Sequence, residues 1–452
     1  MISGDTIAAI ATAPGRGGVA VVRVSGSEAF AIGERLTGRV GIGRSRQASV
    51  SVGPIYSIST DAYRRLSTPI DTGLLLAFKS PHSYTGEDVV EFQCHGGTVT
   101  PRRVLAACLA AGARLARRGE FTERAFLNGR LDYAQAESVL DLIDAKTARA
   151  ADAALEGLSG RRARECHALY ESALDLSTRL EHALDIDEGE LPPDFLPSIR
   201  SSLITLHSSL RAAISKAAES RLLRAGSLVV LAGPPNAGKS SLLNALLDEN
   251  RAIVSDVPGT TRDSIEAWID LDGWPIRLVD TAGLREAKDE LEGEGVKRSE
   301  DLIAKADVVL MLRSCEGERV RSPQPSHLRT FTPSHLLNVT SKCDLNHGEG
   351  LNVSAKTGEG LDELKRAIVA KLEEKVVSSD DGDVPEGDVA AYQEALALLN
   401  GGRETRDVRR EEDLVLMANS VRAAAGRLGE AIGATYSSDM LDNLFSRFCV
   451  GK

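Results

Sequence analysis

The sequence predicts a multidomain α/β protein, and three observations support this prediction. An apolar strand, a glycine-rich loop and a helix follow one another at residues 228–247, which is the pattern of a nucleotide-binding α/β domain. Apolar residues recur at helical spacing on both sides of that domain. The first 120 residues mix short strands with helices, which predicts a separate α+β domain.

Length and composition set the outer limits of the prediction. At 452 residues the chain exceeds one core, since domains run to about 150 residues. Its six cysteines form no C-x-x-C pair, so neither zinc nor a disulfide framework is expected. The N-terminus lacks the basic and apolar regions of a signal peptide, and no apolar run reaches membrane-spanning length, so we expect a cytoplasmic protein without a membrane segment. A net charge of −11 disfavours a broad grip on nucleic acid.

The N-terminal 120 residues contain a glycine-rich turn between two expected strands. Pro14-Gly15-Arg16-Gly17-Gly18 lacks the Lys-Ser ending of a phosphate loop and is not followed at once by a helix, which favours a structural hairpin. The expected strands are residues 6–11, 19–24, 74–78 and 89–92, and the expected helices are 27–36 and 101–111.

Helical segments flank the nucleotide domain. Residues 121–223 are helical by their periodicity, with a break at Pro192-Pro193, and 389–399 and 411–432 are helical again after a polar linker. Arg161, Arg162 and Arg164 are more typical of a solvated helix face than of an RNA patch. We therefore predict one helical domain interrupted by an inserted domain, with boundaries 1–120, 121–225, 226–377 and 378–452.

The loop Gly233-Pro-Pro-Asn-Ala-Gly-Lys-Ser240 has the phosphate-loop spacing G-x-x-x-x-G-K-S. Gly233 and Gly238 let backbone N–H groups approach the phosphates, next to the positive end of the following helix. Lys239 can reach the β- and γ-phosphates, and Ser240 can bind the Mg²⁺ that bridges them. A nucleoside triphosphate site is predicted here.

Two further segments complete the phosphate end of such a site. Thr261, in a polar loop before a tight Asp272-Gly273 hairpin, is the expected sensor of magnesium and γ-phosphate. The hairpin leads into Asp280-Thr281-Ala282-Gly283, where the aspartate can hold Mg²⁺ through water and the glycine N–H can meet the γ-phosphate. Leu284 stands in place of the glutamine that orients water in Ras-type enzymes, so hydrolysis needs another device.

The base is predicted to be guanine. Asp344, in Ser341-Lys342-Cys343-Asp344, stands where GTPases carry N-K-x-D and can accept from both guanine N–H groups. Ser341 replaces the usual asparagine, which bears on guanine affinity and selectivity. The predicted GTP-binding set, with Ser240 and Thr261 as magnesium ligands, is Asn236, Ala237, Gly238, Lys239, Ser240, Ser241, Ser255, Asp256, Val257, Pro258, Gly259, Thr260, Thr261, Asp280, Thr281, Ala282, Gly283, Lys342, Asp344, Ser354, Ala355 and Lys356.

Long strings along the whole chain resemble the tRNA-modification GTPases called MnmE or TrmE. These strings are residues 13–20 with Arg23, residues 84–91 followed by His95-Gly96-Gly97, residues 119–129, and the closing 445–452, which ends in C-V-G-K. The resemblance implies an α+β N-terminal domain that binds folate and dimerises, an all-α helical domain, and a Ras-like α/β G domain inserted into the helical domain.

The resemblance also implies partners and a reaction. With a flavin-dependent partner called MnmG or GidA, such proteins modify C5 of the wobble uridine in certain tRNAs, using the one-carbon unit of a reduced folate such as 5-formyl- or methylene-tetrahydrofolate. Folate contacts of the family match Arg23, Glu91, Arg130 and Lys452. At Arg130 many relatives carry lysine, and the two cations are not interchangeable.

A potassium site and a catalytic acid are implied in the G domain as well. The family's potassium site matches Asn236, Ser255, Val257 and Thr260, and a monovalent cation there can take the role of an arginine finger. Its water-orienting acid matches Glu292. From the residues alone, Glu292 is more typical of a solvated position in a highly charged stretch.

Cys449 has three competing roles: a packed small residue, a nucleophile or acid, and a partner contact. The resemblance brings the terminal motif to the folate site and so favours a catalytic role, whereas little in the neighbouring sequence would lower a thiol pKa. For the whole chain the alternative function is a GTPase switch in ribosome assembly, and a weaker one is a folate transferase that acquired a GTPase. Assembly factors usually append a Lys/Arg-rich module, which this sequence lacks.

Overall fold

The computed structural model of the chain describes residues 4–43, 48–57, 68–185, 191–249, 266–280, 301–314, 336–345, 347–348, 350–377, 388–401, 411–432 and 438–452. The chain forms two compact units. The first contains Met1–Leu140 together with Thr435–Lys452, and the second contains Asp141–Ala434. The C-terminal segment therefore belongs to the same unit as the N-terminal sheet, although helices of the second unit precede it in the sequence.

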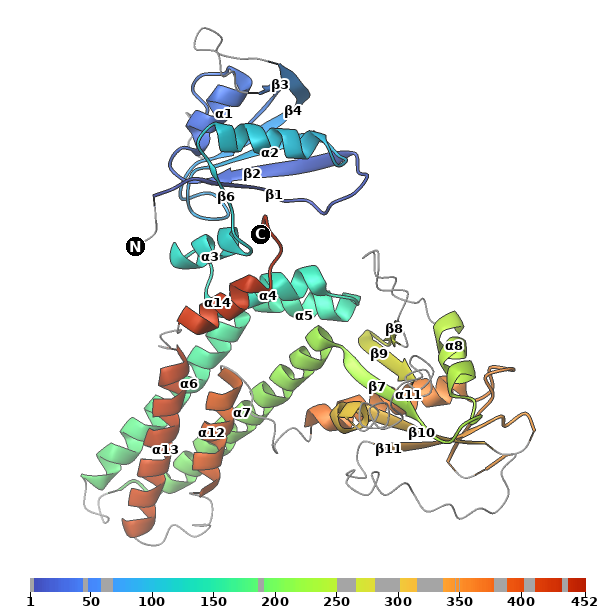
Figure 1. Ribbon diagram of the computed structural model, residues 1–452. Helices are drawn as coiled ribbons and strands as arrows, with labels where there is room; N and C mark the ends of the chain where they lie inside the picture. The colour runs from blue at the N-terminus through green and yellow to red at the C-terminus, as the bar shows by residue number, and fades with distance from the viewer. Residues whose placement is uncertain are drawn as a thin grey trace. The chain divides into compact units, whose positions relative to one another are not determined.

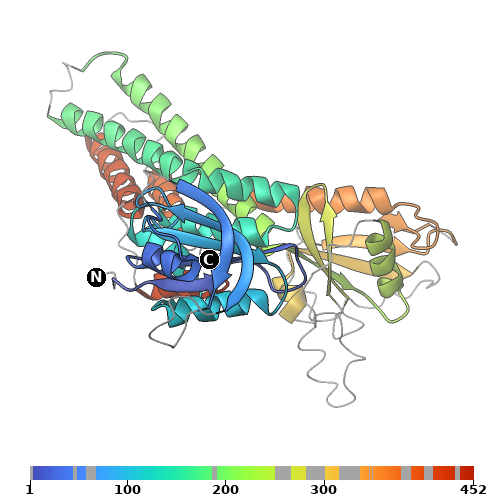
Figure 2. The ribbon, with the colours of Figure 1, turned by 90° about the horizontal axis from the view of Figure 1, so that it is seen from above.

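The first unit is built on a six-stranded sheet with strand order β3-β4-β5-β2-β1-β6 (Figure 1). All neighbouring strands are antiparallel except β1 and β6. Figure 2 shows the strong curvature of its blue strands. The strands are β1 (Ile7–Ile10), β2 (Val19–Ser25), β3 (Ala48–Tyr56), β4 (Pro69–Phe78), β5 (Val89–His95) and β6 (Arg114–Leu115).

Two helices, α1 (Ala29–Thr37) and α2 (Thr100–Ala110), cover one face of this sheet. Val22, Phe92 and Val104 are fully buried between the sheet and the helices. Because side chains alternate along a strand, the neighbouring positions point to the opposite face. There Val50, Val52 and Leu74 are exposed, so part of that face is apolar and open.

The C-terminal segment completes the first unit. Helices α3 (Glu120–Leu127) and α4 (Tyr133–Asp144) follow the sheet in the sequence, and α14 (Ser438–Ser446) is the last helix. Phe445 and Phe448 pack against Ala136 and Leu140 in one apolar cluster. This burial fixes the position of a chain end that would otherwise fray.

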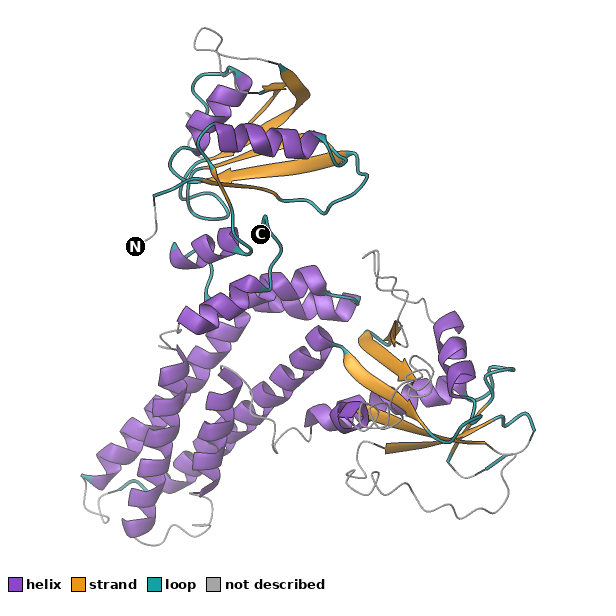
Figure 3. Cartoon of the chain, viewed as in Figure 1, coloured by secondary structure: helices purple, strands orange, loops and turns teal. Residues whose placement is uncertain are grey.

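The second unit begins with a helical bundle (Figure 3). Its apolar core is shared by α6, α7, α12 and α13, with Ala173, Leu210 and Val421 fully buried. Among the described helices none combines the length and the apolarity that a membrane span requires. The bundle helices are α6 (Arg161–Leu184), α7 (Phe195–Ala225), α12 (Asp388–Gly401) and α13 (Glu411–Ile432), and α5 (Ala148–Leu158) precedes them.

The long helix α7 leads directly into the inserted α/β domain. Its six-stranded sheet has the order β12-β11-β10-β7-β9-β8 and is parallel apart from β8, which pairs antiparallel with β9. β7 lies between β10 and β9, so the loop after it opens at the centre of the carboxyl edge. The elements are β7 (Ser227–Ala232), α8 (Lys239–Glu249), β8 (Glu266–Leu271), β9 (Trp274–Asp280), β10 (Val308–Ser314), β11 (Leu336–Ser341), β12 (Leu351–Val353) and α11 (Leu361–Val377).

These elements confirm the predicted fold class of α+β sheet, helical bundle and α/β domain. The turn at 14–18 does join two antiparallel strands, as predicted. Strands β3, β6, β10, β11 and β12 were not predicted. β3 alternates exposed valines with serines and a glycine, which gives a weak apolar signal, and β6 is only two residues long. The four-part division of the chain stays a prediction.

Candidate functional site

The loop between β7 and α8 has the backbone geometry that its glycines predict. Gly233 has a φ of 146°, and a Cβ there would lie 2.4 Å from the carbonyl oxygen of Leu312. Gly238 has a φ of 83°, in the region that favours glycine. Asn236 also adopts a left-handed backbone, with a φ of 61°, and its side chain is exposed. The loop thus turns tightly over the end of β10.

Lys239 is the first residue of α8 and is buried. Its Nζ donates to the carbonyl oxygens of Gly233 and Pro234 at 3.0 and 2.9 Å. These bonds hold an ammonium over the loop at the positive end of an eleven-residue helix. Two sources of positive potential therefore coincide, which is the electrostatic requirement for binding phosphate.

Ser240 and Asp280, two residues for which the sequence predicted contacts with Mg²⁺, meet where β9 ends. The Ser240 hydroxyl donates to Asp280 Oδ2 at 2.7 Å. Asp280 ends β9 and pairs in register with Leu231, so strand pairing brings it to the loop. A hydroxyl and a carboxylate are the hard oxygen donors that Mg²⁺ prefers, and the residues present fit that ion.

The predicted base-recognition residues come from the ends of β11 and β12. Asp344 is exposed, and its Oδ1 accepts from the buried Ser354 hydroxyl at 2.7 Å. The Cys343 N–H donates to the Val353 carbonyl at 3.2 Å and ties the two loops together. Lys342 has a φ of 61°, which is rare for a residue with a side chain. The carboxylate is thus held in place with one oxygen already oriented.

Ser341 binds the phosphate loop in this structure. It is 5% exposed, and its hydroxyl lies 2.7 Å from the carbonyl oxygen of Ala237 and 3.1 Å from that of Arg313. A hydroxyl has one hydrogen to donate, so these two carbonyls share it. The replacement of asparagine by Ser341 therefore leaves a tether between β11 and the loop.

Several predicted residues lie outside the described part of the chain. Of the described ones, Ser241 and Lys356 are exposed near the site and Ala355 is half-buried. The predicted roles that fall outside the described residues are those of Ser255, Asp256, Val257, Pro258, Gly259, Thr260, Thr261, Thr281, Ala282, Gly283 and Glu292.

A second polar site lies in the first unit, on the sheet face that the helices leave open. Arg23 of β2 and Glu91 of β5 pair in register, and Arg23 Nε donates to Glu91 Oε1 at 2.7 Å. The guanidinium also lies 5.4 Å from the ring centre of Tyr84 and 5.6 Å from that of Phe121. Phe121 is fully buried behind the guanidinium, whereas Tyr84, Arg23 and Glu91 are partly exposed, and an ion pair beside an aromatic ring suits a flat, polar heterocycle.

The chain end comes to this second site. Burial and the charge of Arg23 lower the pKa of the Lys452 ammonium, while Cys449 partly opposes the effect. Arg118 Nε donates to the Phe448 carbonyl at 2.9 Å, and Arg118 pairs with Val450 in an isolated bridge. Gly451 has a φ of 105°, and a Cβ there would lie 2.2 Å from the Ile10 carbonyl oxygen.

Cys449 is exposed in this segment, unlike the other cysteines within the described residues. Burial raises the pKa of Cys94 to about 11 and raises that of Cys108 and Cys343 as well. An exposed thiol at the chain end is the one available to a partner or a substrate. In the described part of the chain no cluster of His, Cys, Asp and Glu could hold a metal ion.

Arg130 follows α3 in the same unit. It is exposed, its backbone N–H donates to the Ala125 carbonyl at 2.8 Å, and its side chain runs beside Gly86. Tyr84 and Phe121 were part of the strings that carry the resemblance, but sequence reasoning assigned them no role. Tyr84 lies in a loop and Phe121 in α3, so only the folded structure shows that both rings approach Arg23. Burial raises the pKa of Tyr84, whose hydroxyl lies 2.9 Å from that of Thr122.

Comparisons with known proteins agree with this geometry. A family model described as the GTP-binding protein TrmE N-terminus matches residues 6–130, and one described as the MnmE helical domain matches residues 133–449. A tRNA modification GTPase MnmE from Symbiobacterium thermophilum is 40% identical over 99% of both chains. The chain belongs to the MnmE family of tRNA modification GTPases. The MnmE of Dichelobacter nodosus is 41% identical over the full length of both chains.

Membership of the MnmE family confirms the resemblance and the GTPase assignment, and it favours tRNA modification over ribosome assembly. Among solved structures, the G domain of the T. maritima FeoB iron transporter covers 32% of this chain and 98% of its own, with 25% identity and a TM-score of 0.23, too low to carry an argument. The roles of individual residues in this MnmE-family chain stay predictions.

Proposed function

We propose that this chain hydrolyses GTP as one component of the system that modifies C5 of the wobble uridine in tRNA. The one-carbon unit would come from a reduced folate bound in the first unit, and a flavin-dependent partner of the MnmG or GidA type would complete the complex. Membership of the family supports the reaction class. The observation that carries the proposal is the presence of two separate sites, one suited to a nucleotide and one to a flat polar ligand.

For GTP, the described residues supply phosphate binding and base recognition. Lys239 and the α8 N-terminus favour the β- and γ-phosphates, the adjacent Ser240 and Asp280 suit Mg²⁺, and Asp344 suits guanine. The proposed potassium ligands are Asn236, Ser255, Val257 and Thr260, and Glu292 is the proposed acid that orients water. A bound K⁺ would supply positive charge near the phosphates, where Leu284 supplies none.

For the folate, Arg23, Glu91, Arg130 and Lys452 are the proposed contacts. Glu91 can accept from pterin N–H groups, and the three cations suit the carboxylates or ring carbonyl of the ligand. The partly exposed ring of Tyr84 beside Arg23 supports this assignment, since it offers a flat apolar surface to a heterocycle, while the buried Phe121 ring backs the Arg23 guanidinium from inside. Cys449 is then a candidate for chemistry near the one-carbon unit.

We further propose a homodimer through the first unit, in the cytoplasm. The open face of the N-terminal sheet supports it, because Val50, Val52 and Leu74 are exposed there on neighbouring strands. Contiguous exposed apolar surface of this kind marks interaction sites.

Nucleoside analysis of tRNA from cells lacking the gene tests the proposal. We expect the modified wobble uridine to disappear and to return with the unsubstituted gene. Cys449→Ser should leave the modification missing while GTP hydrolysis and folate affinity stay nearly unchanged. Normal modification in that variant would exclude Cys449 from the mechanism, and loss of folding or folate binding would return it to a structural role. Unaltered tRNA in cells without the gene would refute the proposed function.

A further inference from the structure

Residues 146–149, which join the end of the α4–α5 link to the first turn of α5, contact the β8–β9 hairpin of the G domain. Thr147 is buried, and its hydroxyl donates to the Gly273 carbonyl in the hairpin turn at 2.7 Å. The same oxygen accepts from the Ala150 N–H at 3.2 Å and caps α5. One side chain therefore fixes both the start of a helix and the tip of the hairpin.

Two cations of this segment lie over the two tryptophans of the chain, both of which belong to the hairpin. Lys146 Nζ is 4.7 Å from the ring centre of Trp268, and Arg149 Cζ is 4.3 Å from that of Trp274. Arg149 Nη2 also lies 2.6 Å from Glu219 Oε1 on α7, which orients the guanidinium. Such cation–π contacts strengthen when the ring is buried, and Trp274 is 1% exposed.

The backbone of the hairpin turn and that of the α7–β7 junction each pack closely against a neighbouring side chain at a glycine. Gly273 has a φ of 85°, and a Cβ there would lie 2.9 Å from Arg149 Cβ. At the junction of α7 and β7, a Cβ on Gly226 would lie 2.2 Å from the Trp268 ring. Movement of the hairpin therefore requires movement of the start of α5 or of the α7–β7 junction.

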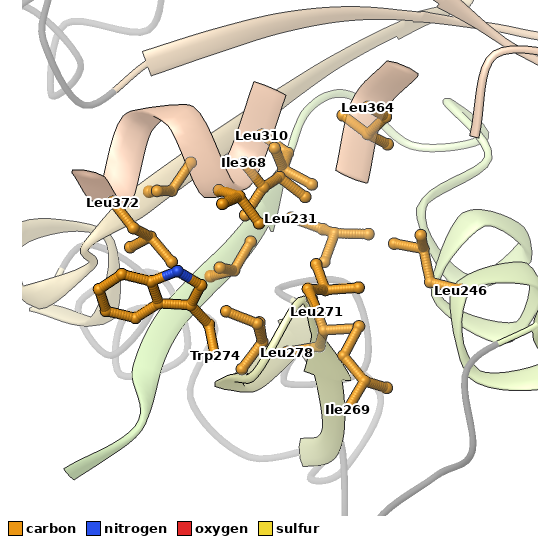
Figure 4. Packing of buried hydrophobic residues seen from close by; sticks show 14 of the residues in the cluster. Leu231, Leu246, Ile269, Leu271, Trp274, Leu278, Leu310, Leu364, Ile368 and Leu372 are labelled. Atoms are coloured by element: carbon orange, nitrogen blue, oxygen red, sulfur yellow. The ribbon is translucent and has the colours of Figure 1, made fainter. Parts of the chain in front are cut away.

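The hairpin and the helices also share one apolar core. Ala150 of α5 and Leu222 and Leu223 of α7 belong to the same buried cluster as Trp274 and Leu372. Figure 4 shows the indole of Trp274 beside Leu372 within this cluster. Toward its N-terminus, α7 contributes other residues, among them Ile199 and Leu210, to the core of the helical bundle. One continuous helix thus belongs to both cores.

At its other end the hairpin reaches the nucleotide site. β9 ends at Asp280, which accepts from Ser240, and β8 begins five residues after the predicted γ-phosphate sensor Thr261. A hairpin that reaches the phosphate loop through Asp280 at one end, and is held by two cations and a hydroxyl near its turn, is a physical link between the predicted nucleotide site and the helices.

We propose that Lys146, Thr147 and Arg149 are positioning residues that couple the nucleotide state to the helical bundle. They hold the β8–β9 hairpin in one position and thereby set the relative affinity of the site for GTP and GDP. By thermodynamic linkage, a change of nucleotide must change the strength of this contact by the same factor. The inference rests on the proposed function in requiring GTP at the β7–α8 loop.

Substitutions that remove the charge but keep the aliphatic stem test the coupling in the full chain. The variants are Lys146→Met, Arg149→Met and the double variant, and the control is Lys216→Met. Lys216 of α7 forms ion pairs with Glu156 of α5 and Glu165 of α6. Its substitution therefore removes a cation from the same group of helices at a position whose ion pairs do not involve the hairpin. The measurements are the dissociation constants of a non-hydrolysable GTP analogue and of GDP, and the tryptophan emission in each state.

We expect the ratio of the two dissociation constants to change about two- to fivefold in each single variant, and more in the double variant, but not in the control. Emission should differ between the two nucleotide states in the unsubstituted chain, and this difference should shrink in the variants. Trp268→Phe and Trp274→Phe assign the signal to one ring.

Thr147 supplies a second, independent test. Thr147→Val should change the ratio in the same direction, whereas Thr147→Ser, which keeps the hydroxyl, should restore it. The coupling is refuted if the ratio of the two dissociation constants in every folded variant equals that of the control. It is also refuted if the tryptophan emission of the unsubstituted chain is the same with the GTP analogue and with GDP. An unsubstituted chain that binds neither nucleotide would overturn the proposed function together with this inference.

Discussion

The two candidate sites differ in how the chain assembles them. The nucleotide site uses a contiguous loop at the end of β7, with backbone groups and one lysine, and strand pairing adds Asp280 and Ser341. The second site uses side chains from β2, a loop, β5, α3 and the last residue of the chain. The first can therefore be recognised from a short motif, and the second only from long-range pairing or from a whole-chain resemblance.

The two glycine-rich turns make the same comparison at smaller scale. Both follow a strand, but the turn at 14–18 connects antiparallel β1 and β2, while residues 233–238 connect β7 to a helix. Glycine supplies the space in both turns. The lysine and the helix N-terminus supply the charge in only one, so composition alone does not define a phosphate site.

The largest expected effect is a loss of GTP hydrolysis at the nucleotide site without any change at the proposed folate site. Lys239→Ala should lower kcat for GTP hydrolysis by about 100- to 1000-fold, because it removes a preorganised cation from the phosphate end. Folate affinity should not change. Steady-state kinetics and calorimetry on the folded variant measure both quantities. Lys371→Ala on α11 is the matched control, since Lys371 forms an ion pair with Glu374 of the same helix. A similar loss of folate affinity would contradict the independence of the sites.

The elements that carry the predicted nucleotide site could be predicted from the sequence because each depends on a short stretch of chain. The loop, the Asp272-Gly273 turn and α8 follow from spacing and turn chemistry, and the structure has all three. The tether from Ser341 to Ala237 could not be predicted, because it depends on β11 lying beside β10 rather than on any local pattern. Likewise, Phe445 and Phe448 pack on Ala136 and Leu140 across some 300 positions, which a single sequence does not encode visibly.

The second prediction concerns the proposed folate site, which no short sequence motif defines. Arg23→Met should weaken reduced-folate binding about ten- to hundredfold, the range expected for a lost hydrogen bond to a charged group together with its unpaired partner Glu91. GTP hydrolysis should be retained. Arg117→Met serves as the control. Arg117 also forms an ion pair with a glutamate, Glu123 of α3, but the Arg117 side chain is largely exposed. Calorimetric titration with 5-formyl-tetrahydrofolate decides the matter, and equal affinity in Arg23→Met would remove this residue from the site.

A smaller effect is expected where Ser341 joins the strand to the loop. Ser341→Ala leaves the Ala237 carbonyl without this donor, which should weaken GTP and ITP alike by about three- to tenfold. The ratio of the two affinities should stay constant, because Asp344 rather than Ser341 reads the base. Competition binding with the two nucleotides gives the ratio, and Asp344→Asn is the contrasting variant that should alter it. A changed ratio in Ser341→Ala would show that the hydroxyl takes part in base recognition.

The smallest expected effect concerns protons at the second site. Burial and the charge of Arg23 lower the pKa of Lys452, so its ammonium is disfavoured in the folded chain. The unfolded chain then binds this proton more tightly, and Lys452 makes the free energy of unfolding rise with pH between the folded and unfolded pKa values.

An anionic folate beside Lys452 would favour the charged form and raise its pKa again. Binding should therefore take up a fraction of one proton at pH values between the lowered pKa of Lys452 and its pKa in the complex, and the uptake should fall as the pH drops below this range, because the amine is then protonated before the ligand binds. Calorimetry in two buffers of different ionisation enthalpy measures the uptake directly. Lys452→Met should abolish it while Lys239→Ala should not, since only the second site contains the titrating group. Uptake that persists in Lys452→Met would assign the proton to another residue and weaken the case for the chain end as part of this site.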